Sequence, residues 1–481
     1  MLLKRFYDTK LAQASFLIGC AATGEAIIVD ANRDVAQYLH AADAEGLRIS
    51  HVTETHIHAD FVSGSRELAE RSGGLLLLSG EGGPDWSYAF AESAKARLLH
   101  DGDTFMVGNL RVEVMHTPGH TPEHLTFVVT DTPATDQPIG AITGDFIFAG
   151  DVGRPDLLEI AAHVVGTMEA SARTLFHSLQ RFRQRPDHIQ LWPGHGAGSA
   201  CGKALGAMPS TTLGYEKIAN WGLRLTGEDA FVEAVLAGQP EPPRYFAEMK
   251  RINKEGPRVL NGLPHPALVA DAMLADVITR GELVVDTRSA DAFAARHVPG
   301  TINIPLNKSF STWAGWFVPF DRDFYLIAGD TGQSTIAEVA RDLAMIGLDR
   351  VAGYFEPGAI DAWVKSGREV WAIAQMSPAE VARQLAAGDV AVLDVRGRSE
   401  WMAGHLPNVK NMPAGYIADD LASLPNDRPL VLHCQGGGRS AIAASVLRAR
   451  GMSNVVNMRG GFAAWEAQGN AVHVEPFLAS L

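Results

Sequence analysis

Two histidines and an aspartate stand at alternate positions of one short run, His56-Ile57-His58-Ala59-Asp60. Residues 47–52, just before this run, alternate apolar and polar side chains as a half-buried strand does. The three polar side chains therefore follow a strand end, and loops on a rigid sheet often carry binding chemistry. Imidazole nitrogens and carboxylate oxygens together suit a divalent first-row metal. The run thus favours a fold in which a sheet presents metal ligands where its strands end.

Three later strand ends also carry donor side chains. A Pro-Gly turn separates one strand from His120, the apolar strand 139–144 ends directly before Asp145, and a second Pro-Gly turn precedes His195. Each of these side chains alone is more often a turn or core residue than a ligand. Four such strand ends in succession within one domain predict a metal site.

The order of these donor groups resembles the metallo-β-lactamase fold superfamily over about residues 1 to 250. The resemblance implies an αββα sandwich with the metal at one edge of its two sheets. Hydrolytic members typically have a further histidine directly after the first aspartate, and it helps to hold a second metal. This chain has Phe61 there, so a second metal would keep only Asp60, His195 and a shared Asp145.

In the persulfide dioxygenase branch of this superfamily, the positions that match His56, His120 and Asp145 hold a single Fe(II) per chain. Two histidines and one carboxylate form the facial triad of non-haem Fe(II) oxygenases, which leaves positions open for O2 and substrate. The resemblance implies that three further side chains orient these ligands and tune the iron. They are His58, Asp60 and His195.

Three other residues near these motifs bear on the substrate. Arg154 matches a family arginine near the substrate thiol, although a loop ion pair is the alternative. Ala197 stands where some relatives carry an aromatic residue near the thiol carrier, so glutathione is not indicated as that carrier. Cys201 is more readily interpreted as a buried thiol than as a reactive one, because Lys203 is its only basic neighbour in the sequence.

Residues 265 to 475 contain a duplication. Val284-Val285-Asp286-Thr287-Arg288 matches Val392-Leu393-Asp394-Val395-Arg396, and Arg296-His297-Val298-Pro299-Gly300 matches Gly404-His405-Leu406-Pro407-Asn408 at the same offset. Each copy alternates apolar strands with amphipathic helices, which predicts two small α/β domains with parallel sheets.

The second copy carries a cysteine at the end of a strand. Cys434 is followed by Gln435, three glycines and Arg439, and then by helical sequence. The glycines allow successive backbone N–H groups to point inward and form an anion nest beside a helix N-terminus. Such a nest lowers the pKa of a thiol and favours a nucleophilic thiolate. A phosphatase loop is the alternative, but it has five residues between cysteine and arginine, and this chain has four.

The flanking segments resemble rhodanese domains, which are sulfurtransferases whose cysteine carries a persulfide sulfur. The resemblance implies that Cys434 and Arg439 are catalytic and that Asp394, Arg396 and His405 are structural. In the first copy, Ala328 replaces the cysteine and Gln333 the arginine, so that copy is predicted to be a non-catalytic spacer or interface domain.

The expected plan is therefore a mixed α/β and α+β multidomain chain. An αββα sandwich over residues 1–255 precedes an inactive rhodanese domain over 265–370 and an active one over 375–477. A Pro-rich run at 238–245 marks the exit from the first domain, and residues 211–223 before it are predicted to be helical.

The charge and composition of the chain argue against several classes of partner and location. The net charge of −14 argues against nucleic acid or an anionic membrane as a partner, and no apolar run is long enough to span a bilayer. The N-terminus lacks the apolar core of a signal peptide. The three cysteines are too far apart to form a disulfide framework, so a reducing cytoplasm is the expected location.

The whole chain resembles persulfide dioxygenase–rhodanese fusion proteins. The resemblance implies oxidation of a low-molecular-weight persulfide by O2 to sulfite at the iron, in sulfide detoxification. It implies that Cys434 then forms thiosulfate from sulfite and persulfide, in a homo-oligomer such as a dimer or tetramer. Two alternatives stay open. One is a metal-dependent thioester hydrolase of the glyoxalase II type, and the other is a sulfur-relay scaffold with a structural metal.

Overall fold

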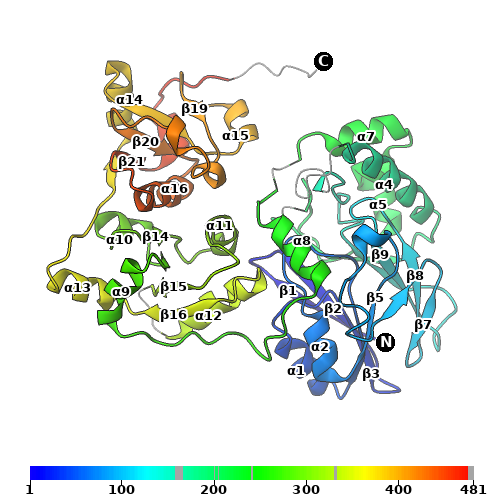
Figure 1. Ribbon diagram of the computed structural model, residues 1–481. Coiled ribbons are helices and arrows are strands. Elements are labelled where there is room, and N and C mark those ends of the chain that lie inside the picture. The colour runs from blue at the N-terminus through cyan, green and yellow to red at the C-terminus, as the bar shows by residue number, and fades with distance from the viewer. Residues whose placement is uncertain (158–165, 200, 204, 240–241, 330–332, 475–481) are drawn as a thin grey trace. The chain divides into compact units, whose positions relative to one another are not determined.

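Figure 1 shows a computed structural model of the protein, which describes residues 1–157, 166–199, 201–203, 205–239, 242–329 and 333–474. The chain forms two compact units. The first comprises Met1–Leu263 with Ala344–Gly347, and the second comprises Pro264–Leu343 with Leu348–Leu481. No helix among the described residues is both long enough and apolar enough to cross a bilayer.

The first unit contains two six-stranded sheets. One has the strand order β1 (Leu2–Asp8), β2 (Gln13–Cys20), β3 (Glu25–Val29), β4 (Arg48–Thr53), β5 (Leu75–Ser79) and β6 (Arg97–Leu99). The other has the order β12 (Thr211–Thr212), β11 (Gln190–Pro193), β10 (Gly140–Gly144), β9 (Leu125–Asp131), β8 (Leu110–His116) and β7 (Thr104–Val107).

Three layers of buried apolar side chains hold the two sheets and their helices together. The middle layer joins the two sheets, with Phe16 from the first and Phe127 from the second. The outer layers bury α1 (Ala36–Ala44) and α2 (Ser65–Ser72) on the first sheet, and α4 (Met168–Phe182) and α7 (Glu228–Leu236) on the second. The predicted αββα sandwich is confirmed. Burial on both faces of each sheet explains why β2 is apolar almost throughout.

The prediction of one helix over residues 211–223 is wrong in detail. It forms β12, then α5 (Leu213–Ala219), then α6 (Trp221–Arg224). Asn220 breaks the helix in extended conformation, and its side chain accepts a hydrogen bond from Gly222 N. Its amide nitrogen also donates to the carbonyl oxygens of Phe148 and Asp151. These tertiary hydrogen bonds outweigh the local helical preference of the segment.

The first unit continues beyond the Pro-rich run, of which residues 240–241 lie outside the described part. The helix α8 (Phe246–Glu255) follows it, and the unit ends at Leu263.

The second unit holds the two repeats, each built on a parallel sheet. Copy one has the order β14 (Ile302–Asn303), β13 (Leu283–Asp286), β15 (Phe324–Ile327) and β16 (Val351–Phe355). Its helices are α9 (Leu274–Thr279), α10 (Ala290–Ala295), α11 (Phe310–Phe317), α12 (Gln333–Met345) and α13 (Gly358–Lys365).

Copy two has the order β17 (Ala374–Met376), β21 (Val455–Met458), β20 (Leu430–His433), β18 (Ala391–Asp394) and β19 (Lys410–Asn411). Its helices are α14 (Pro378–Ala387), α15 (Arg398–Ala403), α16 (Gly438–Ala449) and α17 (Gly461–Ala467). Residues 330–332 of copy one and 475–477 at the expected end of copy two lie outside the described residues.

Hydrogen bonds repeat between the copies as the sequence does. Arg288 donates to Asp286 in copy one, and Arg396 donates to Asp394 in copy two. Each arginine also donates to the carbonyl oxygen of the residue before the repeat's histidine. These buried pairs tie the end of β13 in copy one and of β18 in copy two to a following loop, which agrees with the structural role expected for Asp394 and Arg396.

Candidate metal centre and sulfur-transfer loop

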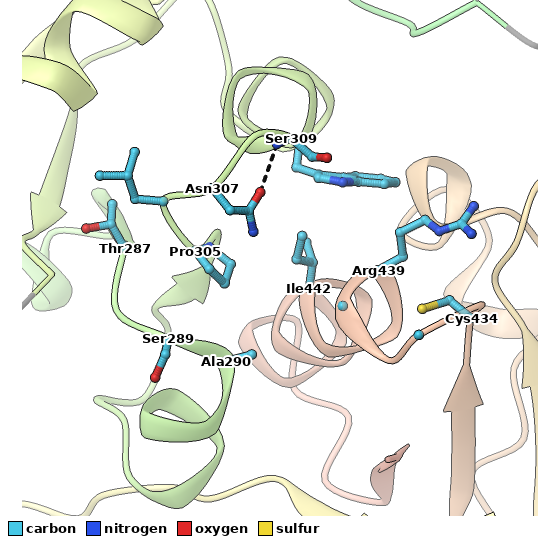
Figure 2. Close-up of a pocket in the computed structure, with 13 residues that line it drawn as sticks. Thr287, Ser289, Ala290, Pro305, Asn307, Ser309, Cys434, Arg439 and Ile442 are labelled. Atoms are coloured by element: carbon cyan, nitrogen blue, oxygen red, sulfur yellow. Dashed lines mark hydrogen bonds between the residues drawn. The ribbon is translucent and has the colours of Figure 1, made fainter. Parts of the chain in front are cut away.

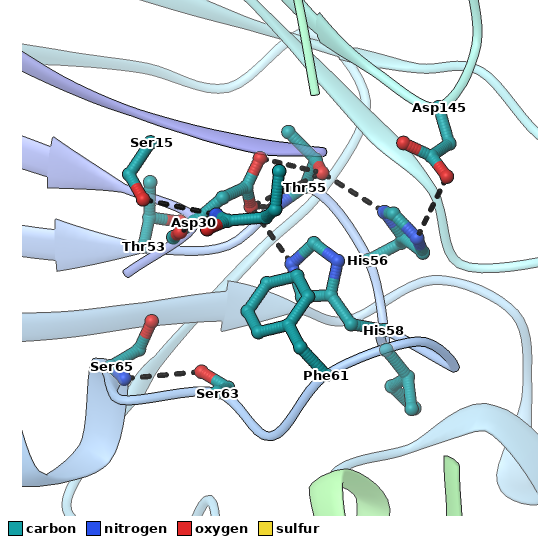
Figure 3. Close-up of polar contacts among 12 residues, drawn as sticks. Ser15, Asp30, Thr53, Thr55, His56, His58, Phe61, Ser63, Ser65 and Asp145 are labelled. Carbon is teal, nitrogen blue, oxygen red and sulfur yellow. Dashed lines mark hydrogen bonds and ion pairs between the residues drawn. The ribbon is translucent and has the colours of Figure 1, made fainter. Parts of the chain in front are cut away.

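The three predicted metal ligands meet in the first unit. His56, His120 and Asp145 are all buried, and one donor atom from each lies within 4.8 Å of the others. Asp145 Oδ2 is 3.5 Å from His120 Nε2 and 4.0 Å from His56 Nε2, and Figure 3 shows His56 and Asp145 facing each other. Ligand bonds of about 2 Å place the donors of one ion roughly 3 Å apart, so only a small contraction is needed.

Backbone and hydroxyl contacts fix the nitrogen that each histidine presents. His120 Nδ1 lies 2.9 Å from the carbonyl oxygen of Arg154, and His195 Nδ1 lies 3.0 Å from that of Ala12. A carbonyl only accepts, so both Nδ1 atoms donate, and Nε2 is the nitrogen that each ring turns toward Asp145. His56 Nδ1 lies 3.0 Å from the Thr55 hydroxyl, which leaves its Nε2 for Asp145 as well.

The site is suited to a cation because it holds unpaired buried carboxylates. Neither oxygen of Asp145 or of Asp60 accepts a hydrogen bond in the described structure. Unpaired buried carboxylates cost several kcal/mol, and a bound metal removes that cost. Burial and the neighbouring histidines hold the pKa of His56 well below its usual value, and burial lowers the pKa of His120. Both imidazoles are therefore neutral, as metal ligands must be.

His58 faces away from this donor set. Its Nε2 lies 3.2 Å from Asp30 Oδ1, and Figure 3 shows the pair beside the ring of Phe61. Burial alone would lower the pKa of His58, but Asp30 and Glu54 raise it to about 9. An imidazolium has no lone pair for a metal, so this geometry fits the orienting role expected for His58.

The loop between the first two ligand motifs is held from distant parts of the chain. Asp30, at the end of β3, accepts hydrogen bonds from the Thr55 backbone N–H at 2.6 Å and from its hydroxyl. Asn253 of α8 donates to the carbonyl oxygens of His58 and Phe61 and accepts from Ser63 N. No sequence motif points to Asn253, because about 190 residues separate it from this loop.

Asp30→Asn should loosen the ligand loop. The substitution removes the charge that pairs with His58 and weakens the contacts with Thr55, so we expect a 10- to 100-fold loss of metal affinity. Breaking a buried ion pair costs about 3–5 kcal/mol, so the thermal midpoint should also fall. Metal retention during dialysis against a chelator measures the affinity. Asp43→Asn, on the exposed side of α1, is the control, and equal metal retention in both variants would contradict this role of Asp30.

Two buried carboxyl groups behind the loop have raised pKa values. Burial raises the pKa of Glu54 to about 8 and that of Glu123 to about 7. Glu123 accepts a hydrogen bond from Ile57 N at 2.7 Å and so supports the loop between the two histidines.

Glu54→Gln should flatten the dependence of stability on pH. The unfolded carboxyl ionises near pH 4.5 and the folded one near pH 8, so the wild-type free energy of unfolding falls as the pH rises across this window. Glutamine does not ionise, so the variant lacks this pH-dependent part of the free energy of unfolding. That part is worth about 1.4 kcal/mol per pKa unit. Thermal midpoints of metal-free protein at both ends of the window test it, with exposed Glu45→Gln as control. Parallel curves for wild type and Glu54→Gln would refute the assignment.

A second donor set lies on the other side of Asp145. Donor atoms of Asp60, His195 and Cys201 lie within 4.8 Å of one another. His195 Nε2 is 3.3 Å from Asp60 Oδ2 and 3.4 Å from Asp145 Oδ1. Burial and the two carboxylates hold the pKa of the Cys201 thiol well above its usual value, so the thiol stays protonated without a metal. The sequence showed no relation between Cys201 and Asp60, which are far apart in the chain.

Arg154 makes the loop ion pair that was the alternative to a substrate contact. Its guanidinium donates to both oxygens of Asp156, at 2.8 and 2.6 Å, and its side chain is fully buried. Its carbonyl oxygen orients His120. In this conformation Arg154 stabilises the loop that carries it.

Ala197 is exposed two residues after His195.

In the second unit, the Cys434 loop follows the predicted strand, loop and helix order. Cys434 comes directly after β20, and α16 begins at Gly438. Gly437 N donates to Cys434 Sγ at 3.1 Å, and the Ser440 hydroxyl lies 3.6 Å from the same sulfur. Gly437 has a φ of 95°, which favours glycine and turns its N–H toward the sulfur. These hydrogen-bond donors and the start of α16 place positive partial charge around the Cys434 sulfur.

Arg439 lines the same cavity as Cys434 but is paired with an acid. Its guanidinium donates to both oxygens of Glu400, at 2.6 and 2.7 Å. Half-burial would raise the pKa of Glu400, but these hydrogen bonds lower it. In copy one, buried Ala328 follows β15 at the position of the cysteine, so that position has no nucleophile.

Comparison with known proteins gives two family matches, one in each unit. A model described as "Metallo-beta-lactamase superfamily" matches residues 8–195, and one described as "Rhodanese-like domain" matches residues 377–468. A crystal structure of a metallo-beta-lactamase from Staphylococcus aureus is 40% identical, with a TM-score of 0.66, and the match covers 74% of this chain and 99% of that chain. The chain belongs to the metallo-β-lactamase superfamily.

This metallo-β-lactamase superfamily protein has relatives with two kinds of activity in their names. A mitochondrial persulfide dioxygenase of Bos taurus is 28% identical, over 40% of this chain and 68% of that protein. A hydroxyacylglutathione hydrolase of Rhizobium etli is 32% identical, over 36% of this chain and 58% of that protein. The comparisons thus give the superfamily and a C-terminal rhodanese-like domain, and they leave the reaction of the first unit to chemical argument.

Proposed function

We propose that the protein oxidises low-molecular-weight persulfides with O2 to sulfite and transfers sulfane sulfur through Cys434, in sulfide detoxification. The observation that carries the first part is the buried set of two neutral histidines and one unpaired carboxylate. This is the donor set of non-haem Fe(II) oxygenases. His56, His120 and Asp145 would hold one Fe(II), which supplies redox chemistry and open positions for O2 and for the substrate sulfur.

The protein's own side chains have supporting roles in this proposal. Thr55 and the carbonyl oxygen of Arg154 hold the two histidine ligands in the correct tautomer. His58, Asp60 and His195 surround the ligands without completing the triad. Phe61 is fully buried against His58 and brings no donor atom to the position next to Asp60. Arg154 remains a candidate for substrate contact only if its bond with Asp156 opens.

The second unit would remove the sulfite. A persulfide gives its outer sulfur to the Cys434 thiolate and releases its thiol, and sulfite then takes that sulfur to form thiosulfate. No net oxidation occurs in these steps. The N–H of Gly437 and the start of α16 stabilise the thiolate as attacking and as leaving group. We propose that this protein acts in the cytoplasm as a homo-oligomer, with persulfide, O2 and sulfite as its small-molecule partners.

A two-metal hydrolase of thioesters is the second candidate, and Cys201 is the observation that favours it. A thiolate there would give a second metal three protein donors besides shared Asp145. The distinguishing experiment adds glutathione persulfide or S-lactoylglutathione to one iron-loaded preparation. Sulfite release with oxygen uptake supports the oxygenase. Thioester cleavage without oxygen uptake supports the hydrolase.

A further inference from the structure

The cavity at Cys434 is larger than sulfur transfer to an inorganic anion requires. It measures about 540 Å³, within the roughly 300–1,000 Å³ of sites that take organic ligands. Figure 2 shows Cys434, Arg439 and Ile442 of copy two on one side, with Asn307, Ser309 and Pro305 of copy one on the other. Copy one has Ala328 at the position that matches the cysteine, yet its residues line this second side of the cavity.

The wall from copy one has the chemistry of a binding surface for a neutral organic group. Asn307 and Ser309 bring an amide and a hydroxyl group to the cavity, and Trp313 brings an aromatic ring. Thr287 and Ser289 also line it, but their hydroxyl groups bond within copy one, with Ile327 O and Ala292 N. Among the described residues that line the cavity there is no carboxylate, and the one cation, Arg439, is paired with Glu400. Hydroxyl and amide side chains match the amide and hydroxyl groups of peptide-like thiols, and an aromatic side chain adds contact area at low entropic cost.

Contacts between the copies hold this wall against the Cys434 loop. Asn303 N, in β14, donates to the Ser445 hydroxyl of α16 at 2.9 Å. Trp316 of α11 packs against Gly415, where a Cβ atom would lie 2.4 Å from its ring, and its ring meets that of Tyr416 edge-on at 5.2 Å. The segment from Pro305 to Trp313 lies between these two contacts, so its position relative to Cys434 is set by packing.

We infer that copy one is the carrier-binding half of the sulfur-transfer site. The side chains of Asn307, Ser309 and Trp313 bind the organic part of an amide-bearing thiol persulfide, and Cys434 takes the outer sulfur. The Cys434 thiolate attacks that sulfur, a new S–S bond forms as the S–S bond of the donor breaks, and the carrier leaves as a thiolate that takes a proton. This inference rests on the proposed sulfur transfer and adds the class of donor that the site selects.

Asn307→Ala and Trp313→Ala, in the full chain, test the inference. Transfer is measured to sulfite from glutathione persulfide, coenzyme A persulfide and cysteine persulfide, and to cyanide from thiosulfate. We expect KM for the two large donors to rise about 10-fold, as loss of one hydrogen bond or ring contact predicts, and KM for thiosulfate to stay unchanged. Lys308→Ala is the matched control, because Lys308 is exposed beside Asn307 and does not line the cavity.

Equal effects on all donors, or none, would overturn the inference. Trp313→Ala could unfold copy one, so Asn307→Ala, at an exposed position, must show the same selectivity. Calorimetric titration of coenzyme A and glutathione into the wild type, Asn307→Ala and Lys308→Ala gives a readout without turnover. Binding weakened only in Asn307→Ala, with no transfer in the wild type, would retain the carrier site and refute the proposed function. Absence of binding to the wild type would refute the carrier site itself.

Discussion

Cys434→Ser should abolish sulfur transfer and leave oxygen uptake by the first unit intact. A serine hydroxyl is not ionised near neutral pH and cannot carry a sulfane sulfur, so transfer should fall by on the order of a thousandfold or more. Thiosulfate formation from sulfite and glutathione persulfide measures the loss. Sulfite should then accumulate during persulfide oxidation, because nothing consumes it.

Cys20→Ser is the matched control for this substitution. Cys20 is a buried strand residue that accepts a hydrogen bond from Asn109 N, a role that a serine can also fill. If Cys434→Ser removed oxygen uptake together with sulfur transfer, the two activities would depend on one cysteine. That result would favour the alternative function of a sulfur-relay scaffold. Persistent transfer would show that Cys434 is not the nucleophile.

Asp145→Asn should remove the iron and with it all persulfide-dependent oxygen uptake. Asp145 is the only carboxylate of the proposed triad, and an amide is a much poorer ligand for Fe(II). We expect metal affinity to fall at least 100-fold, while transfer from thiosulfate through Cys434 continues. Iron retained after gel filtration, measured by elemental analysis, reports the change.

Asp60→Asn is compared with Asp145→Asn, because Asp60 is also buried and no group donates a hydrogen bond to its oxygens in the described structure. In a one-iron centre, Asp60→Asn keeps the iron and alters only the rate. In a two-metal centre, Asp60 is a ligand, and its loss lowers the metal content as the loss of Asp145 does. Equal loss of metal from the two variants would therefore contradict a mononuclear site.

Local signals in the sequence were enough to locate several elements. The strands predicted at 47–52 and 139–144 form β4 (Arg48–Thr53) and β10 (Gly140–Gly144), each within one residue of the predicted bounds. Each of these strands has its own hydrophobic pattern. Asn220 shows the limit of such signals, because contacts with residues about 70 positions away decide where its helix breaks.

The candidate metal site, too, could be predicted only in part from the sequence. Its donors could be found from sequence because each stands at a strand end, and parallel or stacked strands bring such ends together. The residues that support them could not be found, since Asp30 and Asn253 act through contacts that only the tertiary fold creates. The proximity of Cys201 to Asp60 was missed for that reason, and it makes the number of metal ions per chain the decisive measurement.

Metal content and oxygen uptake, measured on the same sample, decide between an iron oxygenase and a hydrolase. The protein is purified with Fe(II), its metals are counted, and glutathione persulfide and then coenzyme A persulfide are added in an oxygen electrode. We expect one iron per chain, consumption of O2 and release of sulfite. Zinc or two metals per chain, no oxygen uptake, and cleavage of S-lactoylglutathione would contradict it and would identify the first unit as a hydrolase.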